Sequence, residues 1–328
     1  MYYLPRVATS NSDAWPEIPL AEWEDTRATL HLWSQVLGKI KVRRAPLVNH
    51  WWNVALQLTS RGWTTGPIPC GVRAFDLEMD FIDHRVVLST SEGERRAVEM
   101  RPRTVADFYR TACAACDELD LTTPIRTVPS EIEDGIPFEH DETHRAYDQD
   151  AAQRFFRATL SAHRVLQEFR ARFVGKCSPV HFFWGSFDLT VTRFSGRRAA
   201  APTRAMPGYP RWANAEAYSH ECCSAGFWPG QGLGEPAFYS YAFPEPDGYA
   251  AARVAPEAAA YNEDFGQFLL PYDAVRTAPD PDAALLAFLQ SSYEAAADHA
   301  DWPRKDLERA PGEIDRLEEL LGRSGGSR

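Results

Sequence analysis

Long apolar runs and basic clusters are both missing from this 328-residue sequence. No window approaches eighteen consecutive apolar residues, and the first six residues lack the basic-then-apolar pattern of a secretory signal. We therefore expect a cytoplasmic protein with no membrane partner. The formal net charge is −11, whereas a protein that binds the phosphate backbone of a nucleic acid needs clustered Lys and Arg. We therefore also expect no nucleic-acid partner.

Cysteine is too scarce for a disulfide framework. The chain has six cysteines, and two of them, Cys222 and Cys223, are adjacent. Disulfide frameworks belong to short secreted domains, so we expect reduced thiols. Cys113 and Cys116 form a C-x-x-C pair, but no second pair accompanies them to complete a zinc site, and packing is their expected role.

Several catalytic motifs are absent as well. The sequence has no Walker loop, no G-x-G-x-x-G after a strand and no G-x-S-x-G elbow, so ATP-binding, dinucleotide-binding and esterase functions have no support. What it does have is 44% hydrophobic residues, enough for a substantial core, and 12% aromatic residues. Many of the aromatics lie beside Gly or Pro, which favours pockets and tight turns.

Two periodicities predict an α+β fold, with a largely antiparallel sheet flanked by amphipathic helices in a single domain. Phe75, Leu77, Met79 and Phe81 alternate with acidic residues, which is typical of a strand with one wet face. Apolar residues at three- and four-residue spacing predict the helices. The expected helices span 19–41, 104–119, 148–174 and 280–299, and the other expected strands span 54–59, 86–88, 97–100, 125–128, 180–194, 238–243 and 268–270.

The predicted domain organisation has three parts. Residues 1–15 form an N-terminal lead-in, residues 16–300 form the single α+β domain, and residues 301–328 form an acidic helical tail with a disordered end. Within the domain, the acidic segment 129–148 is expected to be a loop that acts as a lid. Gly185 is expected to mark either a bulge in the long strand 180–194 or a place where another group approaches the backbone.

The stretch 175–230 is the strongest candidate for a functional site. It combines histidines, carboxylates and cysteines with glycines and large aromatics, and we predict a metal site built from His181, His220 and Glu221, with His50 as a further imidazole. Two imidazoles and a carboxylate leave positions open on Fe(II), and the same ligands suit Zn(II). His220 and Glu221 are adjacent, so both can be ligands only if their segment is irregular.

A second hypothesis uses these residues without a metal. A pair of His220 with Glu221 or Asp188 in an apolar pocket can act as a general acid or base. A third, purely structural possibility is that His181 is a buried histidine satisfied by a backbone carbonyl.

An aromatic cavity is predicted around the candidate site, lined by Trp51, Trp52, Trp184, Phe227 and Trp228. The favoured function is a metal-dependent enzyme, a non-haem iron type of oxidoreductase rather than a hydrolase or lyase, that acts on a small organic molecule. The alternatives are a metal-free acid–base enzyme and a non-catalytic protein that binds a small molecule. The sequence does not indicate the substrate or the oligomeric state.

Several segments together resemble a bacterial family known only as a domain of unknown function, DUF5996. They are Trp15-Pro-Glu-Ile-Pro, Asn49-His-Trp-Trp52, Phe81-Ile-Asp-His84, the run from Gly175 to Asp188, Tyr218-Ser-His-Glu221, Gly226-Phe-Trp-Pro-Gly230 and Phe268-Leu-Leu-Pro-Tyr272. The resemblance carries no catalytic role. It implies one family-length unit, which supports a single domain.

Overall fold

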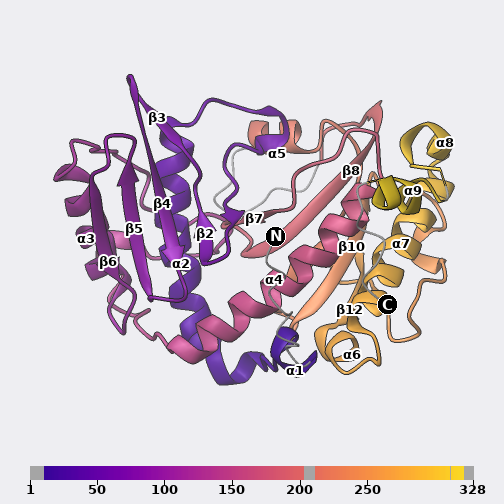
Figure 1. The fold of residues 1–328 in the computed structure, drawn as a ribbon, viewed down its shortest axis with the longest axis horizontal. Coiled ribbons are helices and arrows are strands. Elements are labelled where there is room, and N and C mark those ends of the chain that lie inside the picture. Colours follow the sequence, from indigo (N-terminus) through magenta and orange to yellow (C-terminus); the bar gives the residue numbers. More distant parts are fainter. Residues whose placement is uncertain (1–10, 203–210, 311, 321–328) are drawn as a thin grey trace.

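Two antiparallel sheets, one from each half of the chain, form the frame of the computed structural model, which describes residues 11–202, 211–310 and 312–320 (Figure 1). The N-terminal sheet has the strand order β1-β2-β4-β5-β6, and β3 also pairs with β4. Its strands are β1 (Gln57–Leu58), β2 (Gly62–Thr64), β3 (Ile68–Cys70), β4 (Arg73–Asp80), β5 (Arg85–Thr90) and β6 (Arg95–Glu99). The alternation predicted from Phe75 to Phe81 is thus strand β4.

The C-terminal sheet has the order β11-β12-β10-β9-β8-β7. Its strands are β7 (His181–Phe183), β8 (Asp188–Arg198), β9 (His220–Trp228), β10 (Ala237–Phe243), β11 (Ala260–Asn262) and β12 (Gln267–Pro271). Each neighbouring pair is antiparallel. The predicted α+β fold with antiparallel pairing is confirmed.

The helices are α1 (Asn11–Ala14), α2 (Leu20–Arg44), α3 (Val105–Asp117), α4 (Gln149–Ala171), α5 (Arg211–Ala217), α6 (Tyr272–Arg276), α7 (Pro281–His299), α8 (Arg304–Leu307) and α9 (Glu313–Leu320). Three begin with a side-chain cap: Thr104, Asp148 and Asp280 each accept a hydrogen bond from the backbone N–H three residues on. These caps fix where α3, α4 and α7 start. No helix in the described ranges is long and apolar enough to cross a membrane.

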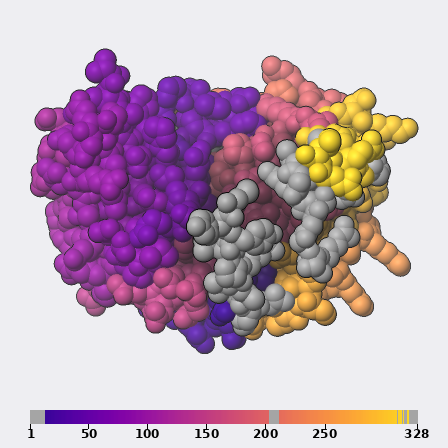
Figure 2. Space-filling view, viewed as in Figure 1, coloured from indigo at the N-terminus to yellow at the C-terminus, as the bar shows by residue number. Residues whose placement is uncertain are grey.

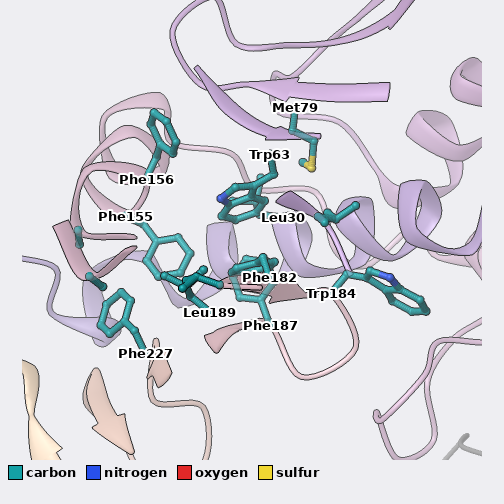
Figure 3. Close-up of a cluster of buried hydrophobic side chains, with 14 of the residues drawn as sticks. Leu30, Trp63, Met79, Phe155, Phe156, Phe182, Trp184, Phe187, Leu189 and Phe227 are labelled. Carbon is teal, nitrogen blue, oxygen red and sulfur yellow. The ribbon is translucent and has the colours of Figure 1, made fainter. Parts of the chain in front are cut away.

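One hydrophobic core runs through both halves of the molecule, which pack side by side (Figure 2). Trp63 of β2 stacks on Phe182 of β7 with ring centroids 4.1 Å apart. Leu56 and Phe182 exchange two backbone hydrogen bonds of 2.8 Å, so the two sheets meet edge to edge at this point. Figure 3 shows Trp63 above Phe182 and Phe187, with Phe155 of α4 beside them. α4 and α7 pack on one face of the C-terminal sheet, which leaves its other face for a cleft.

The predicted strand 180–194 was wrong as a single element. It divides into β7 and β8, and Gly185 lies in the turn between them rather than in a bulge. Phe187 takes a φ of 62° there, which reverses the chain. The irregular pairing falls later, between Phe194 and Arg198.

Residues 125–128 form no strand, so that prediction is wrong. The predicted helical tail contains α8 and α9, and the predicted lead-in contains α1. Residues 1–10 and the last eight residues, where the disordered end was predicted, lie outside the described part of the chain.

Candidate functional site

The free face of the C-terminal sheet forms the floor of a cleft. On β8, Asp188, Thr190 and Thr192 face the cleft, whereas Leu189 and Val191 alternate with them and lie in the core. The cleft consists of two adjoining cavities of about 150 and 500 Å³. Both are lined by Glu131, Ser186, Asp188, Tyr218, Tyr239 and Tyr241.

Hydroxyl groups cover much of this floor. Ser224 of β9 lies within hydrogen-bonding distance of Thr190 and Thr192, at 3.1 and 2.9 Å. The hydroxyls of Tyr218 and Tyr241 lie 2.9 Å apart. A surface of hydroxyls beside aromatic rings suits a polar organic molecule, because it offers both donors and acceptors at fixed positions.

Asp188 is one of two carboxylates in the cleft. It begins β8, its exposed fraction is 6%, and it accepts hydrogen bonds from the hydroxyls of Ser186 and Tyr239. Burial raises the pKa of Asp188, while the bonds from Ser186 and Tyr239 oppose that shift. Asp188 is therefore a firmly held acceptor in the floor of the cleft.

Glu131 is the second carboxylate, and it comes from the loop that follows residue 128. Its backbone has a φ of 60°, a left-handed conformation that non-glycine residues rarely take. The side chain lies against Gly185, where an added Cβ would stand 2.2 Å from Oε1 of Glu131. Glycine in the turn between β7 and β8 thus leaves the space in which the carboxylate lies.

A stripe of buried polar side chains on α2 holds this loop in place. Arg27, His31, Gln35 and Lys39 repeat every four residues, so they share one helix face. Gln35 donates to the carbonyl of Ser130 at 2.9 Å and accepts from its N–H at 2.8 Å. Its amide therefore clamps the residue that precedes Glu131.

Two other members of this polar stripe, Lys39 and His31, bond to the loop before Glu131 and to the turn at Gly185. The Nζ of Lys39 donates to the carbonyl of Val128 at 2.9 Å and to Oγ of Ser130 at 3.1 Å. Nε2 of His31 lies 2.9 Å from the carbonyl oxygen of Gly185. Burial lowers the pKa of His31 to about 3, so the imidazole is neutral and donates this bond.

The two carboxylates interact electrostatically. Burial raises the pKa of Glu131 to about 7, and the charge of Asp188 adds to the shift. Because two neighbouring carboxylates in a partly enclosed cleft resist ionising together, we expect the pair to hold one proton near neutral pH.

The structure places His181 far from His220 and Glu221. His181 pairs with Thr190 and His220 with Arg198, at opposite ends of β8. Thr190 pairs with Gly226, which is six residues from His220 along β9, so at about 3.3 Å per residue the two histidines are roughly 20 Å apart along the sheet. The exposed fraction of His181 is 2%, and burial, with lesser contributions from Lys41 and Arg170, lowers its pKa to about 3.

The purely structural possibility for His181 agrees with the structure in one respect, because the side chain is buried. Within the described residues, however, its Nε2 has no hydrogen-bond partner. Its ring instead makes an edge contact with Phe183, with centroids 4.7 Å apart.

Two of the predicted ligands do come together. The ring centroids of His50 and His220 are 5.5 Å apart. Nδ1 of His50 lies 2.9 Å from the carbonyl oxygen of Ala217, and its Nε2 lies 2.6 Å from Nζ of Lys176. Since an ammonium only donates, Nε2 accepts and Nδ1 carries the hydrogen, so both nitrogens of His50 are engaged.

Glu221 points away from this pair of imidazoles. The segment 220–228 is the regular strand β9, not the irregular turn that joint ligation by adjacent residues requires, so neighbouring side chains leave opposite faces. Glu221 forms an ion pair with Arg197 at 2.7 Å and accepts from Ser195 at 2.9 Å. Across the described ranges, no group of three or more His, Cys, Asp and Glu side chains is placed to hold a metal ion.

Comparison with known protein families identifies the family of this chain. The model of a family of unknown function, DUF5996, matches residues 15–309. The chain belongs to DUF5996. No curated protein and no solved structure shows significant similarity to it. The DUF5996 match spans both sheets, the cleft and the α2 stripe, and leaves only α1 and α9 of the named elements outside it.

The five aromatic residues predicted to line one cavity of this DUF5996 protein are divided among the cleft, a different pocket and the core. Trp51, Trp52 and Trp228 line the cleft. Trp184 instead donates its N–H to the carbonyl of Val54 at 2.8 Å and borders a different pocket. Phe227 lies in the core because it alternates with Gly226 and Trp228 along β9.

Sequence reasoning missed Glu131 and the tyrosines Tyr218, Tyr239 and Tyr241 as site residues. Glu131 lies in the acidic segment expected to be a lid, and nothing in its local pattern separates it from solvated neighbours. The four-residue repeat of Arg27, His31, Gln35 and Lys39 was the available signal, because a polar stripe on an otherwise apolar helix needs partners.

Proposed function

We propose that this protein is an enzyme that performs acid–base chemistry on a small polar organic molecule bound in the cleft. The observation that carries the proposal is the carboxylate pair, Glu131 and Asp188, which line one cleft together with hydroxyls and aromatic rings. Ser186 and Tyr239 donate hydrogen bonds to Asp188, and Gln35 holds the loop residue that precedes Glu131. Strained and fixed side chains of this kind concentrate at functional sites.

The two carboxyl groups have different roles in this proposal. Glu131, with a pKa of about 7, gives a proton to one atom of the bound molecule. Asp188, which is charged while Glu131 holds the shared proton, accepts a proton from another atom, and Ser186 and Tyr239 stabilise that charge. After this step Asp188 holds the proton and Glu131 is charged, and transfer of the proton from Asp188 back to Glu131 restores the starting state. The net proton count of the pair is unchanged, so no further reactant is needed.

The metal-dependent oxidoreductase favoured by the sequence has weaker geometric support. It needs His181, His220 and Glu221 at one point, and β8 and β9 keep them apart. Only His50 and His220 adjoin, and His50 would have to release Ala217 and Lys176 before it could bind Fe(II) or Zn(II). The acid–base alternative needs no such rearrangement.

The test begins with a ligand. Polar metabolites are screened for a rise in the thermal unfolding temperature of the protein, and each hit is incubated with it and followed by mass spectrometry. We expect at least one hit to be converted. The variants Glu131→Gln and Asp188→Asn should bind it with similar affinity but convert it roughly 10²–10⁴ times more slowly, the usual contribution of a general acid or base.

Matched controls separate the alternatives. Glu221→Gln alters a carboxylate on β9 of the same sheet, but outside the cleft, and should leave turnover unchanged. A chelator that abolishes turnover, with recovery on adding Fe(II) or Zn(II), would instead support a metalloenzyme. Tight binding without any conversion would support a non-catalytic binding protein.

A further inference from the structure

A second pocket lies on the other side of the loop that carries Glu131. Its volume is about 300 Å³, at the small end of the usual range for ligand pockets. Three indole rings form its walls: Trp51, Trp184 and Trp212. We call it the tryptophan pocket, and apart from Ser130 and three cationic residues the rest of its lining is aliphatic.

The walls of the tryptophan pocket offer apolar surface rather than hydrogen bonds. Trp184 donates its indole N–H to Val54, and Trp51 donates its own to the carbonyl of Ala213 at 2.9 Å. The rings of Trp51 and Trp212 contact each other with centroids 5.1 Å apart. Trp212 is 62% exposed, so the pocket opens to solvent beside this ring.

The charges at this pocket are all positive. Lys39, Arg43 and Arg126 line it, and no Asp or Glu does. Neither Arg43 nor Arg126 has an ion-pair partner in the part of the chain that the structure describes, although the whole chain carries a net charge of −11. Arg126 is close enough to Lys39 to help burial lower the pKa of Lys39 to about 8. Within the described ranges, these three like charges around an apolar cavity thus have no acidic side chain as a counter-charge.

We propose that the tryptophan pocket is a second binding site, and that it takes a small amphipathic carboxylate with a flat apolar body. The indole rings receive the body, and the carboxylate supplies the counter-charge that Lys39, Arg43 and Arg126 lack. Guanidinium groups suit this role because their planar fork matches the two carboxylate oxygens. The site does not depend on the acid–base chemistry of the cleft.

The probe for this site is cinnamate, a flat aromatic carboxylate, measured by isothermal titration calorimetry against the full chain. Cinnamyl alcohol is its neutral counterpart. We expect cinnamate to bind at least about tenfold more tightly than the alcohol, which corresponds to about 1.4 kcal/mol. Added salt should weaken the binding of cinnamate, because both arginines face solvent.

Three variants locate the site. Arg43→Gln with Arg126→Gln should weaken cinnamate binding about tenfold or more. The matched control, Arg95→Gln with Arg101→Gln, removes the same charge from exposed positions near β6 and should leave binding unchanged. Glu131→Gln should also leave it unchanged, so failure of this proposal is distinguishable from failure of the acid–base proposal.

The proposal is overturned if cinnamate does not bind, if it and the alcohol bind equally, or if the Arg43 and Arg126 double variant binds as well as the control does. The four arginines altered in these variants are all exposed, and the comparison with the alcohol changes only the ligand, so a folding defect does not obscure the result.

Discussion

Glu131 is the residue on which the cleft chemistry depends, because its surroundings favour the protonated form. Folding moves its pKa from 4.5 to about 7. Between these pH values the folded chain holds a proton that the unfolded chain releases. The contribution to stability is therefore fully present below pH 4.5 and is lost as the pH rises through about 7.

We expect Glu131→Gln to remove this pH dependence. The difference in free energy of unfolding, wild type minus variant, should fall by about 1–3 kcal/mol across that range, since one pKa unit corresponds to about 1.4 kcal/mol and partial exposure to water reduces the full value. Urea unfolding at a series of pH values measures it. A difference that stays flat or rises with pH would contradict the shifted pKa.

Gly185→Ala tests the same carboxylate without altering it. The new Cβ would lie 2.2 Å from Oε1 of Glu131, too close for both to stay, and we expect the flexible side chain of Glu131 to move away. We expect a small loss of stability, below about 1 kcal/mol, and loss of the pH dependence described for Glu131. Combining Gly185→Ala with Glu131→Gln should add no further change in the pH profile. A profile like that of the wild type would show that the carboxylate had stayed in place.

At the scale of elements, α2 does more than cover the N-terminal sheet. Its polar stripe reaches across to the loop before Glu131 and to the turn at Gly185, so one helix positions both sides of the cleft. Arg27 extends the stripe by donating to Gln231, which lines the larger cavity, at 2.9 Å. A helix this deeply buried keeps polar residues only where each has a partner.

Replacing Gln35 with Ala should therefore free the loop. Ser130 would lose partners for both its N–H and its carbonyl, at a cost of about 1–3 kcal/mol for each group that stays buried. We expect lower stability and faster amide hydrogen exchange at residues 128–131. The matched control is Gln167→Ala, since Gln167 is an exposed glutamine on α4. Equal effects of the two substitutions would rule out a clamp at Gln35.

At the scale of the whole molecule, the shared core makes the two sheets one cooperative unit. Trp63→Ala removes a fully buried ring at the junction of the sheets and should cost about 3–5 kcal/mol. Far-ultraviolet circular dichroism and tryptophan fluorescence should report one common transition in urea, in the wild type and in the variant alike. Trp212→Ala, at an exposed ring, serves as the control. Two separate transitions would show that the halves unfold independently.

The sequence predicted elements better than it predicted the site. Periodicity and capping residues placed α3, α4 and α7 well, because Thr104, Asp148 and Asp280 act locally. Strand β9 escaped prediction since its run of small residues lacks clear alternation.

The carboxylate pair was beyond the reach of sequence patterns. Glu131 and Asp188 are 57 positions apart in the printed sequence, and tertiary contacts alone bring them into one cleft. His181 and His220, by contrast, were grouped by residue type, and antiparallel pairing through β8 separates them.

Lys39 lies between the tryptophan pocket and the cleft. Its side chain borders the tryptophan pocket, while its ammonium is bonded to the loop that presents Glu131. We expect a carboxylate bound beside Lys39 to change the electrostatic balance of that loop. If it changes the affinity of the cleft for a ligand by some factor, occupancy of the cleft must change the affinity of the tryptophan pocket by the same factor.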